Sequence, residues 1–257
     1  MIAMQYAKQG SFRKLLDSKY NELDWNSKIV NLYFISYGLY TIHEAKLVHK
    51  DFHSGNIVNQ TMFSSFITDF GLCKPVSQDS SSNALFGVLP YIAPEVLYTK
   101  GKEYTQKSDI YSFGIIMSEV FTGYPPYHDI PHNQILAINI CRGQRPKIKC
   151  KIPQLLLDLM NKCLDAETYN RPTAKELVNI LKDFFYDLKN TESELYKQVK
   201  EIKDLNKNIS IYNQVKSARI NYWTHPQAIY TSRLLHLPNL SKPESQSVDY
   251  VEIPNNY

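Results

Sequence analysis

The chain has 257 residues, of which 43% are hydrophobic and 21% are charged, enough for one domain with a substantial core plus an appendage. It has no apolar run of about eighteen residues, so we expect no membrane span, and residues 1–7 lack the basic start and long apolar stretch of a signal peptide. The formal net charge of +4, with acidic and basic residues interspersed, argues against nucleic-acid binding. The four cysteines lack the spacing of a zinc site or a redox pair. We therefore expect a soluble cytoplasmic protein.

Helical patterns dominate the chain. Residues 15–19 read as a short helix, and Asp24 and Ser27 offer N-caps for a longer helix that ends near His43. The inward side of this second helix follows helical spacing at Ile29, Leu32, Tyr33, Ser36, Leu39 and Tyr40.

Two short β-prone runs follow, at residues 57–58 and 66–68, around a predicted loop at residues 60–65. A hairpin here would bring Asp69 beside Asn56. Further on, an almost wholly apolar helix is predicted from Asp109 to Phe121, with Asp109 as a candidate N-cap. The remaining predicted helices cover residues 135–142, 155–164 and 173–188.

Three motifs occur in order along this pattern: His-Lys-Asp-Phe-His-Ser-Gly-Asn at residues 49–56, Asp-Phe-Gly at 69–71 and Ala-Pro-Glu at 93–95. Together they resemble the catalytic loop, the metal-binding triplet and the end of the activation segment of eukaryotic protein kinases. The resemblance implies a mainly α, protein-kinase-like fold: a helical C-terminal lobe with a short β-hairpin at the catalytic cleft.

Phosphoryl transfer needs a carboxylate that orients a hydroxyl group and accepts its proton, and Asp51 fits that role. His53 and Asn56 complete the predicted catalytic set on the same loop. Mg²⁺ prefers oxygen ligands, which Asn56 and Asp69 supply. The resemblance therefore implies ATP and Mg²⁺ as cofactors.

The run at residues 4–11 looks like the hinge between the two lobes of a kinase. By this resemblance, Met4, Gln5 and Ala7 bind the nucleotide, with the backbones of Gln5 and Ala7 as hydrogen-bond partners of adenine. Val58 packs against adenine from below, and Ser11 reaches the ribose.

No G-x-G-x-x-G motif occurs, and no strand segment precedes the hinge-like run. We therefore interpret residues 1–188 as hinge and C-terminal lobe, with the small lobe missing, and expect a truncated, weakly active kinase that binds Mg²⁺-ATP no tighter than about millimolar.

Some positions depart from the family pattern. Lys50 stands where kinases usually carry the arginine that grips a phosphorylated activation loop, so we expect activity to be largely independent of phosphate on Ser80, Ser81 or Ser82. The His-Ser-Gly-Asn form is closest to the tyrosine-kinase-like branch, which mostly modifies serine and threonine. We expect serine/threonine preference over tyrosine.

The resemblance assigns two further structural roles. Asp109 is expected to accept hydrogen bonds from the catalytic-loop backbone, and Arg171 is expected to pair with Glu95 beneath the activation segment.

After the lobe, residues 189–257 form a different region. Residues 191–216 are predicted to be an amphipathic helix at best, and residues 238–257 look disordered. The aromatic segment at residues 222–230 is expected either to dock on the domain or a partner, or to remain a weakly ordered linker.

Two functions remain open from the sequence. One is a protein kinase that transfers the γ-phosphoryl group of ATP to hydroxyl groups of a protein substrate. The other is a catalytically silent, pseudokinase-like scaffold that keeps the lobe as a binding surface.

Overall fold

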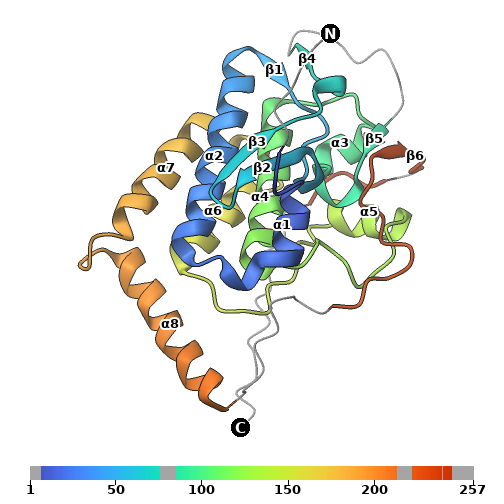
Figure 1. Cartoon of the computed structure of the whole chain (residues 1–257). Helices are drawn as coiled ribbons and strands as arrows, with labels where there is room; N and C mark the ends of the chain where they lie inside the picture. Colours follow the sequence, from blue (N-terminus) through green and yellow to red (C-terminus); the bar gives the residue numbers. More distant parts are fainter. Residues whose placement is uncertain (1–6, 76–84, 213–221, 239, 245–257) are drawn as a thin grey trace.

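Eight α-helices form most of the structure, a computed structural model that describes residues 7–75, 85–212, 222–238 and 240–244 (Figure 1). The helices are α1 (Phe12–Lys19), α2 (Trp25–Glu44), α3 (Pro94–Tyr98), α4 (Gln106–Thr122), α5 (Gln134–Cys141), α6 (Gln154–Cys163), α7 (Ala174–Asp187) and α8 (Glu194–Tyr212). The expected helical lobe is therefore confirmed. None of the helices described is long and apolar enough to cross a lipid bilayer.

The described strands form three antiparallel two-stranded pairs. They are β1 (Leu47–Val48) with β4 (Lys74–Pro75), β2 (Ile57–Thr61) with β3 (Ser64–Ile67), and β5 (Leu85–Gly87) with β6 (Arg233–Leu235). The β2–β3 pair is the predicted hairpin, but its strands extend farther than expected and the loop is correspondingly shorter than residues 60–65.

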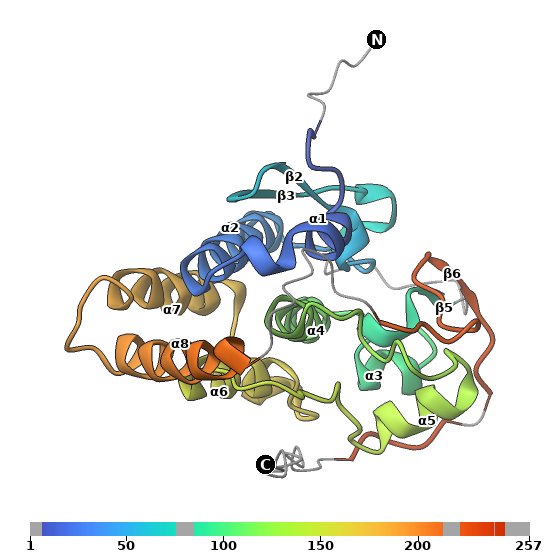
Figure 2. The same cartoon turned by 60° about the horizontal axis from the view of Figure 1, so that its bottom comes forward.

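Helix α4 is the centre of the core, and Figure 2 shows it between α2, α6 and α3. Every residue from Ser108 to Phe121 is buried. The helix begins before the predicted start because Thr105 and Ser108 form a capping box, and Gly123, with φ of +77°, ends it. Asp109 therefore lies inside the first turn, and the alternative of a plain N-cap at this residue is wrong.

Two other helix starts are fixed by local caps. The Asp24 side chain accepts a hydrogen bond from the Ser27 N–H at 2.8 Å, as the sequence suggests. Ser11 caps α1 through the Lys14 N–H at 3.4 Å. This cap lets α1 begin at Phe12, three residues before the predicted start.

A buried polar cluster fixes the β2–β3 hairpin on α2. The Asn31 amide donates to the carbonyl oxygens of Ser27 and Met62 at 2.8 and 2.7 Å. Its oxygen accepts hydrogen bonds from Asn59 at 3.2 Å and from Ser65 at 2.8 Å. Because a buried amide is costly without partners, this cluster favours a single register of the hairpin.

The tail begins with α8, which lies beside α7 in Figure 2. Leu195, Val199 and Ile202 are buried along it, so the predicted amphipathic helix is confirmed. The aromatic segment docks on the lobe: Tyr222 donates to Asp17 at 2.9 Å, and Tyr230 donates to the carbonyl oxygen of Pro126 at 3.0 Å. Of the stretch expected to be disordered, position 239 and residues 245–257 lie outside the described residues.

The predicted Arg171–Glu95 pair is present and bidentate. The two guanidinium nitrogens of Arg171 donate to the carboxylate oxygens of Glu95 at 2.7 and 2.8 Å. The Arg171 side chain is fully buried, and its remaining donors bind the carbonyl oxygens of Asp165 and Lys107. This pair ties the Ala-Pro-Glu end of the activation segment to the start of α7.

We expect Glu95→Gln to lower the free energy of unfolding by about 3 kcal/mol, because it leaves the buried Arg171 charge uncompensated. Urea unfolding followed by circular dichroism measures this. Glu192→Gln is the matched control: it removes the same charge from the exposed Lys197–Glu192 pair and should change stability by less than about 0.5 kcal/mol. Equal losses in the two variants would contradict the assignment.

Candidate active site

The side chain of Asp109, in the first turn of α4, binds the backbone at the start of the catalytic loop, residues 49–56. The Asp109 carboxylate accepts hydrogen bonds from the backbone N–H groups of His49 at 2.9 Å and Lys50 at 3.1 Å. His43 binds the same carboxylate at 3.0 Å. These contacts confirm the role expected for Asp109, and they hold Lys50 in a left-handed conformation with φ of 71°.

Asp51 lies just after this constrained turn and is only 6% exposed. The Asn56 amide donates both to its backbone carbonyl, at 2.9 Å, and to its Oδ2, at 3.1 Å. Burial raises the pKa of Asp51, but the neighbouring His53 and the hydrogen bond from Ser232 outweigh burial and hold the pKa below its usual value. Asp51 is therefore ionised at neutral pH and accepts hydrogen bonds.

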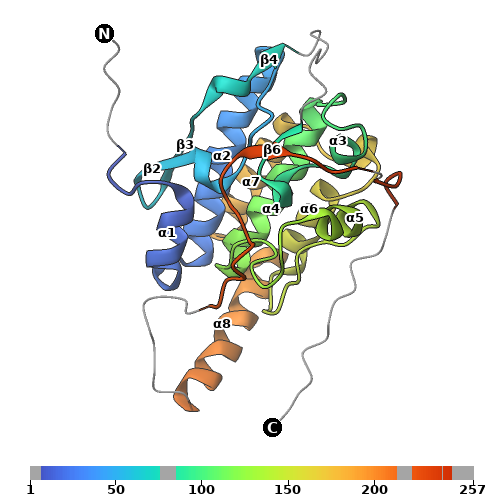
Figure 3. The same cartoon turned by 90° about the vertical axis from the view of Figure 1, so that its right-hand side faces the viewer.

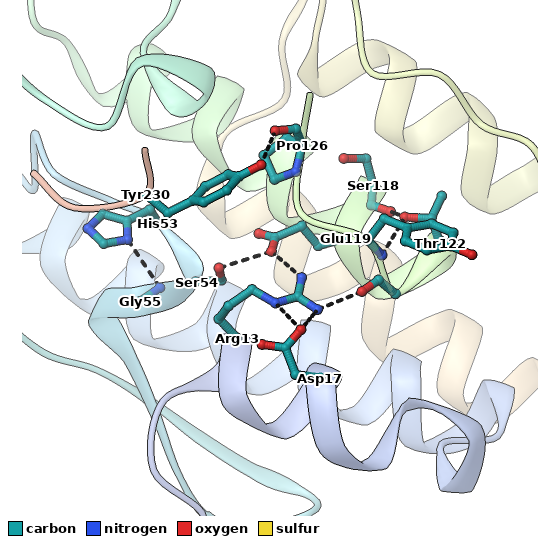
Figure 4. Close-up of polar contacts among 12 residues, drawn as sticks. Arg13, Asp17, His53, Ser54, Gly55, Ser118, Glu119, Thr122, Pro126 and Tyr230 are labelled. Atoms are coloured by element: carbon teal, nitrogen blue, oxygen red, sulfur yellow. Dashed lines mark hydrogen bonds and ion pairs between the residues drawn. The ribbon is translucent and has the colours of Figure 1, made fainter. Parts of the chain in front are cut away.

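His53 is fixed beside Asp51 by its own loop. Its Nδ1 accepts the Gly55 N–H at 3.1 Å (Figure 4), and its Nε2 lies 3.7 Å from Asp51 Oδ2. A Cβ at position 55 would lie 2.7 Å from the imidazole ring, so only glycine fits this close approach. The structure thus brings together the three residues predicted to be catalytic, Asp51, His53 and Asn56.

The two predicted metal ligands lie on adjoining backbone segments. The Thr68 N–H and hydroxyl both donate to the Asn56 carbonyl oxygen, at 2.8 and 3.0 Å, which places Asp69 next to Asn56. Asp69 is exposed and left-handed, with φ of 60°. Because the Asn56 amide nitrogen donates to Asp51, its side-chain oxygen is the atom left for the predicted metal contact.

Among the residues described, no group of three or more His, Cys, Asp or Glu side chains is arranged to hold a metal ion. Mg²⁺ does not need such a cage, since it usually takes one or two protein ligands and fills its octahedron with water and substrate phosphates. The donor set of Asn56 and Asp69 fits this requirement.

The predicted nucleotide residues lie where the N-terminal segment meets β2. Gln9 donates to the Asn59 carbonyl, and Asn59 donates to the Gly10 carbonyl, at 3.0 and 2.9 Å. Ser11 and Val58 face each other in an isolated bridge. Ala7 is half-buried, while Met4 and Gln5 lie outside the described residues.

Sequence reasoning missed a buried ion pair on α4. Glu119 is 0% exposed, and Arg13 of α1 donates to its Oε2 at 2.6 Å. Ser54 of the catalytic loop donates to the same oxygen at 3.0 Å, and Tyr91 donates to Oε1 at 2.7 Å. Figure 4 shows Arg13 and Ser54 converging on Glu119. The only signal in the sequence was Glu119 itself, an acidic residue in the mostly apolar second half of the predicted helix.

Lys50 is engaged within the lobe. Its ammonium group lies over the Tyr104 ring, 5.2 Å from the centroid, and burial together with the nearby Lys74 charge lowers its pKa. Ser80, Ser81 and Ser82 lie outside the described residues, so independence from their phosphorylation remains a prediction.

Residues 1–181 match the family model described as protein tyrosine and serine/threonine kinase. The chain belongs to this protein kinase family. It is 33% identical to mitogen-activated protein kinase kinase kinase nsy-1 of Caenorhabditis elegans over 183 residues, 69% of this chain. It is 29% identical to receptor-interacting serine/threonine-protein kinase 4 of Mus musculus over 216 residues, 79% of this chain.

A third relative is the putative serine/threonine-protein kinase/receptor R826 of Acanthamoeba polyphaga mimivirus, 29% identical over 73% of this kinase chain. The chain spans 12%, 26% and 11% of the lengths of these three relatives, in the order given. The similarity therefore covers the kinase domain and a minor part of each relative.

Val58→Trp should weaken Mg²⁺-ATP binding to this kinase at least about tenfold, or 1.4 kcal/mol, because the larger side chain fills the space predicted for adenine. An NMR titration, which measures millimolar dissociation constants, tests this. Phe63→Trp, at an exposed position in the turn of the same hairpin, is the control and should leave binding unchanged. Unchanged binding in Val58→Trp would mean that adenine does not lie against β2.

Proposed function

We propose that this chain transfers the γ-phosphoryl group of ATP to serine and threonine hydroxyl groups of proteins. The observation that carries the proposal is the state of Asp51: an ionised, buried carboxylate, fixed by Asn56, with a serine hydroxyl 2.5 Å from its Oδ2. That is the arrangement a carboxylate needs to orient an acceptor hydroxyl and take its proton.

The other residues near Asp51 have separate roles. His53 lies against the carboxylate and limits its orientation. Asn56 and Asp69 supply the oxygen ligands for Mg²⁺, which when bound neutralises charge on the phosphate oxygens. The nucleotide contacts Val58, Ser11 and the backbone near Ala7 on one side. The names of the mouse and mimivirus relatives support serine/threonine over tyrosine. The similarity to nsy-1 and to receptor-interacting kinase 4 supports a place in the tyrosine-kinase-like branch.

A silent, pseudokinase-like scaffold is the second candidate. The covered position of Asp51 supports it, because the tail lies over the carboxylate that a protein substrate would have to reach. The two candidates differ in one measurable property, the transfer of phosphate.

Asp51→Asn should reduce phosphoryl transfer by about 10²–10⁴-fold, because an amide neither accepts the proton nor orients the hydroxyl as well. The assay follows radiolabel from about 10 mM Mg²⁺-ATP, well above a millimolar dissociation constant, to peptides that each carry one Ser, Thr or Tyr. Asp158→Asn, at an exposed position on α6, is the matched control and should retain wild-type transfer.

We expect phosphoserine and phosphothreonine as products. Mostly phosphotyrosine would contradict the proposed acceptor class. Absence of transfer by the wild-type chain, with the protein folded by circular dichroism, would favour the scaffold.

A further inference from the structure

The tail returns to the lobe and crosses it beside the catalytic loop. Figure 3 shows the segment that carries β6 passing across this face. Ser232, immediately before β6, donates its hydroxyl hydrogen bond to Asp51 Oδ2 at 2.5 Å. The same hydroxyl lies 3.3 Å from His53 Nε2. A residue 181 positions away in sequence therefore contacts the two side chains that define the acceptor position.

Strand pairing fixes the direction and register of this segment. Residues 233–235 of β6 pair antiparallel with residues 87–85 of β5, in the stretch between the Asp-Phe-Gly and Ala-Pro-Glu motifs. Gly87, opposite Arg233, has φ of +144°, and a Cβ there would lie 3.3 Å from Ile92 and 3.6 Å from Asp51. Glycine at this position therefore lets the paired strands approach the catalytic carboxylate.

Side-chain contacts hold the segment on both sides of Ser232. His132 Nε2 lies 3.2 Å from the Tyr127 carbonyl, to which it donates in the neutral ring, and its Nδ1 then accepts the Ile229 N–H at 3.1 Å. After Ser232, Arg233 donates to the His132 carbonyl at 2.8 Å. Leu235 is 8% exposed, whereas the neighbouring Leu234 is 48% exposed. The segment is thus bound by backbone pairing, polar anchors and one buried side chain, as extended peptides bind at sheet edges.

We propose that residues 229–235 bind the active site as an intramolecular substrate, and that Ser232 is the hydroxyl that receives the phosphoryl group from ATP. The proposal rests on the proposed function and specifies its acceptor. While bound, the segment also excludes protein substrates from Asp51.

The reaction balances with ATP as the second reactant. A bond forms between Ser232 Oγ and the γ-phosphorus, and the bond between that phosphorus and the β–γ bridging oxygen breaks. The bridging oxygen keeps the electron pair and leaves as part of ADP. The hydroxyl proton passes to Asp51 and then to water.

The product favours release of the segment. A phosphoserine carries about −1.5 to −2 charges at neutral pH, and here it would face the ionised Asp51. Repulsion between the like charges should weaken the docking of residues 229–235, so that modification opens the site.

The first experiment locates the phosphate after the 257-residue chain is incubated with about 10 mM Mg²⁺-ATP. Mass spectrometry should find it on Ser232 and not on the exposed neighbour Thr231. Ser232→Ala should remove this label, whereas Thr231→Val should keep it. The labelled fraction per unit time should stay constant on about tenfold dilution, because an intramolecular reaction does not depend on protein concentration. A rate that falls in proportion to concentration would overturn the intramolecular assignment.

The second experiment weakens the binding of residues 229–235 to the lobe and leaves Asp51, His53 and Asn56 unchanged. Leu235→Asp places a charge at a buried position and should lower Ser232 labelling, raise transfer to added peptides several-fold and speed amide exchange of residues 85–87. Leu234→Asp makes the same change at the exposed position next to it and should alter none of these. If Leu235→Asp changes neither labelling nor exchange, the proposal is wrong.

Failure of this inference and failure of the proposed function give different results. Transfer to added peptides with no label on Ser232 overturns the intramolecular substrate and leaves the kinase activity standing. No transfer to either acceptor, with residues 85–87 still protected from exchange, overturns the proposed function and the Ser232 reaction with it.

Discussion

The buried carboxylate of Glu119 joins parts of the lobe that are far apart in sequence. Its two oxygens bind Arg13 of α1, Ser54 of the catalytic loop and Tyr91 near the end of the activation segment. A carboxylate with no exposure is stable only when it is paired and hydrogen-bonded, so each of these contacts is required by the burial itself. Moving Arg13 would leave the buried Glu119 charge without its ion-pair partner, and moving Ser54 or Tyr91 would remove a hydrogen bond from it.

Asp109 fixes the other end of the catalytic loop. It binds the backbone of His49 and Lys50, whereas Glu119 binds Ser54. The two acidic residues lie on one rigid helix, about 15 Å apart at 1.5 Å per residue. The catalytic loop is therefore fixed at both ends by the most deeply buried helix of the lobe, and Asp51 lies between the two attachments. This explains how the loop can hold the Asp51 carboxylate in one position.

The C-terminal tail also contacts the Asp51 carboxylate. Asn56 approaches Asp51 from the same loop, and Ser232 approaches from the opposite end of the chain. Both lower the pKa of Asp51, against the effect of burial. One set of contacts thus has two effects: it holds the pKa of Asp51 below its usual value, and it places the Ser232 hydroxyl against Asp51 Oδ2. The β5–β6 pairing couples this hydroxyl to the stretch between the Asp-Phe-Gly and Ala-Pro-Glu motifs.

The sequence by itself determined the family, the helices and the grouping of Asp51, His53 and Asn56 on one loop, because these depend on local spacing: helical periodicity, caps and short motifs. It also determined the Arg171–Glu95 and Asp109 contacts, through positions that resemble those of other kinases. Only the tertiary structure decided that Arg13 meets Glu119, and that Ser232 contacts Asp51. Such contacts join residues more than a hundred positions apart, and neither residue carries a local signal of the other. They depend on the path of the whole chain, which is set by the packing of α4 and by strand pairing across the lobe.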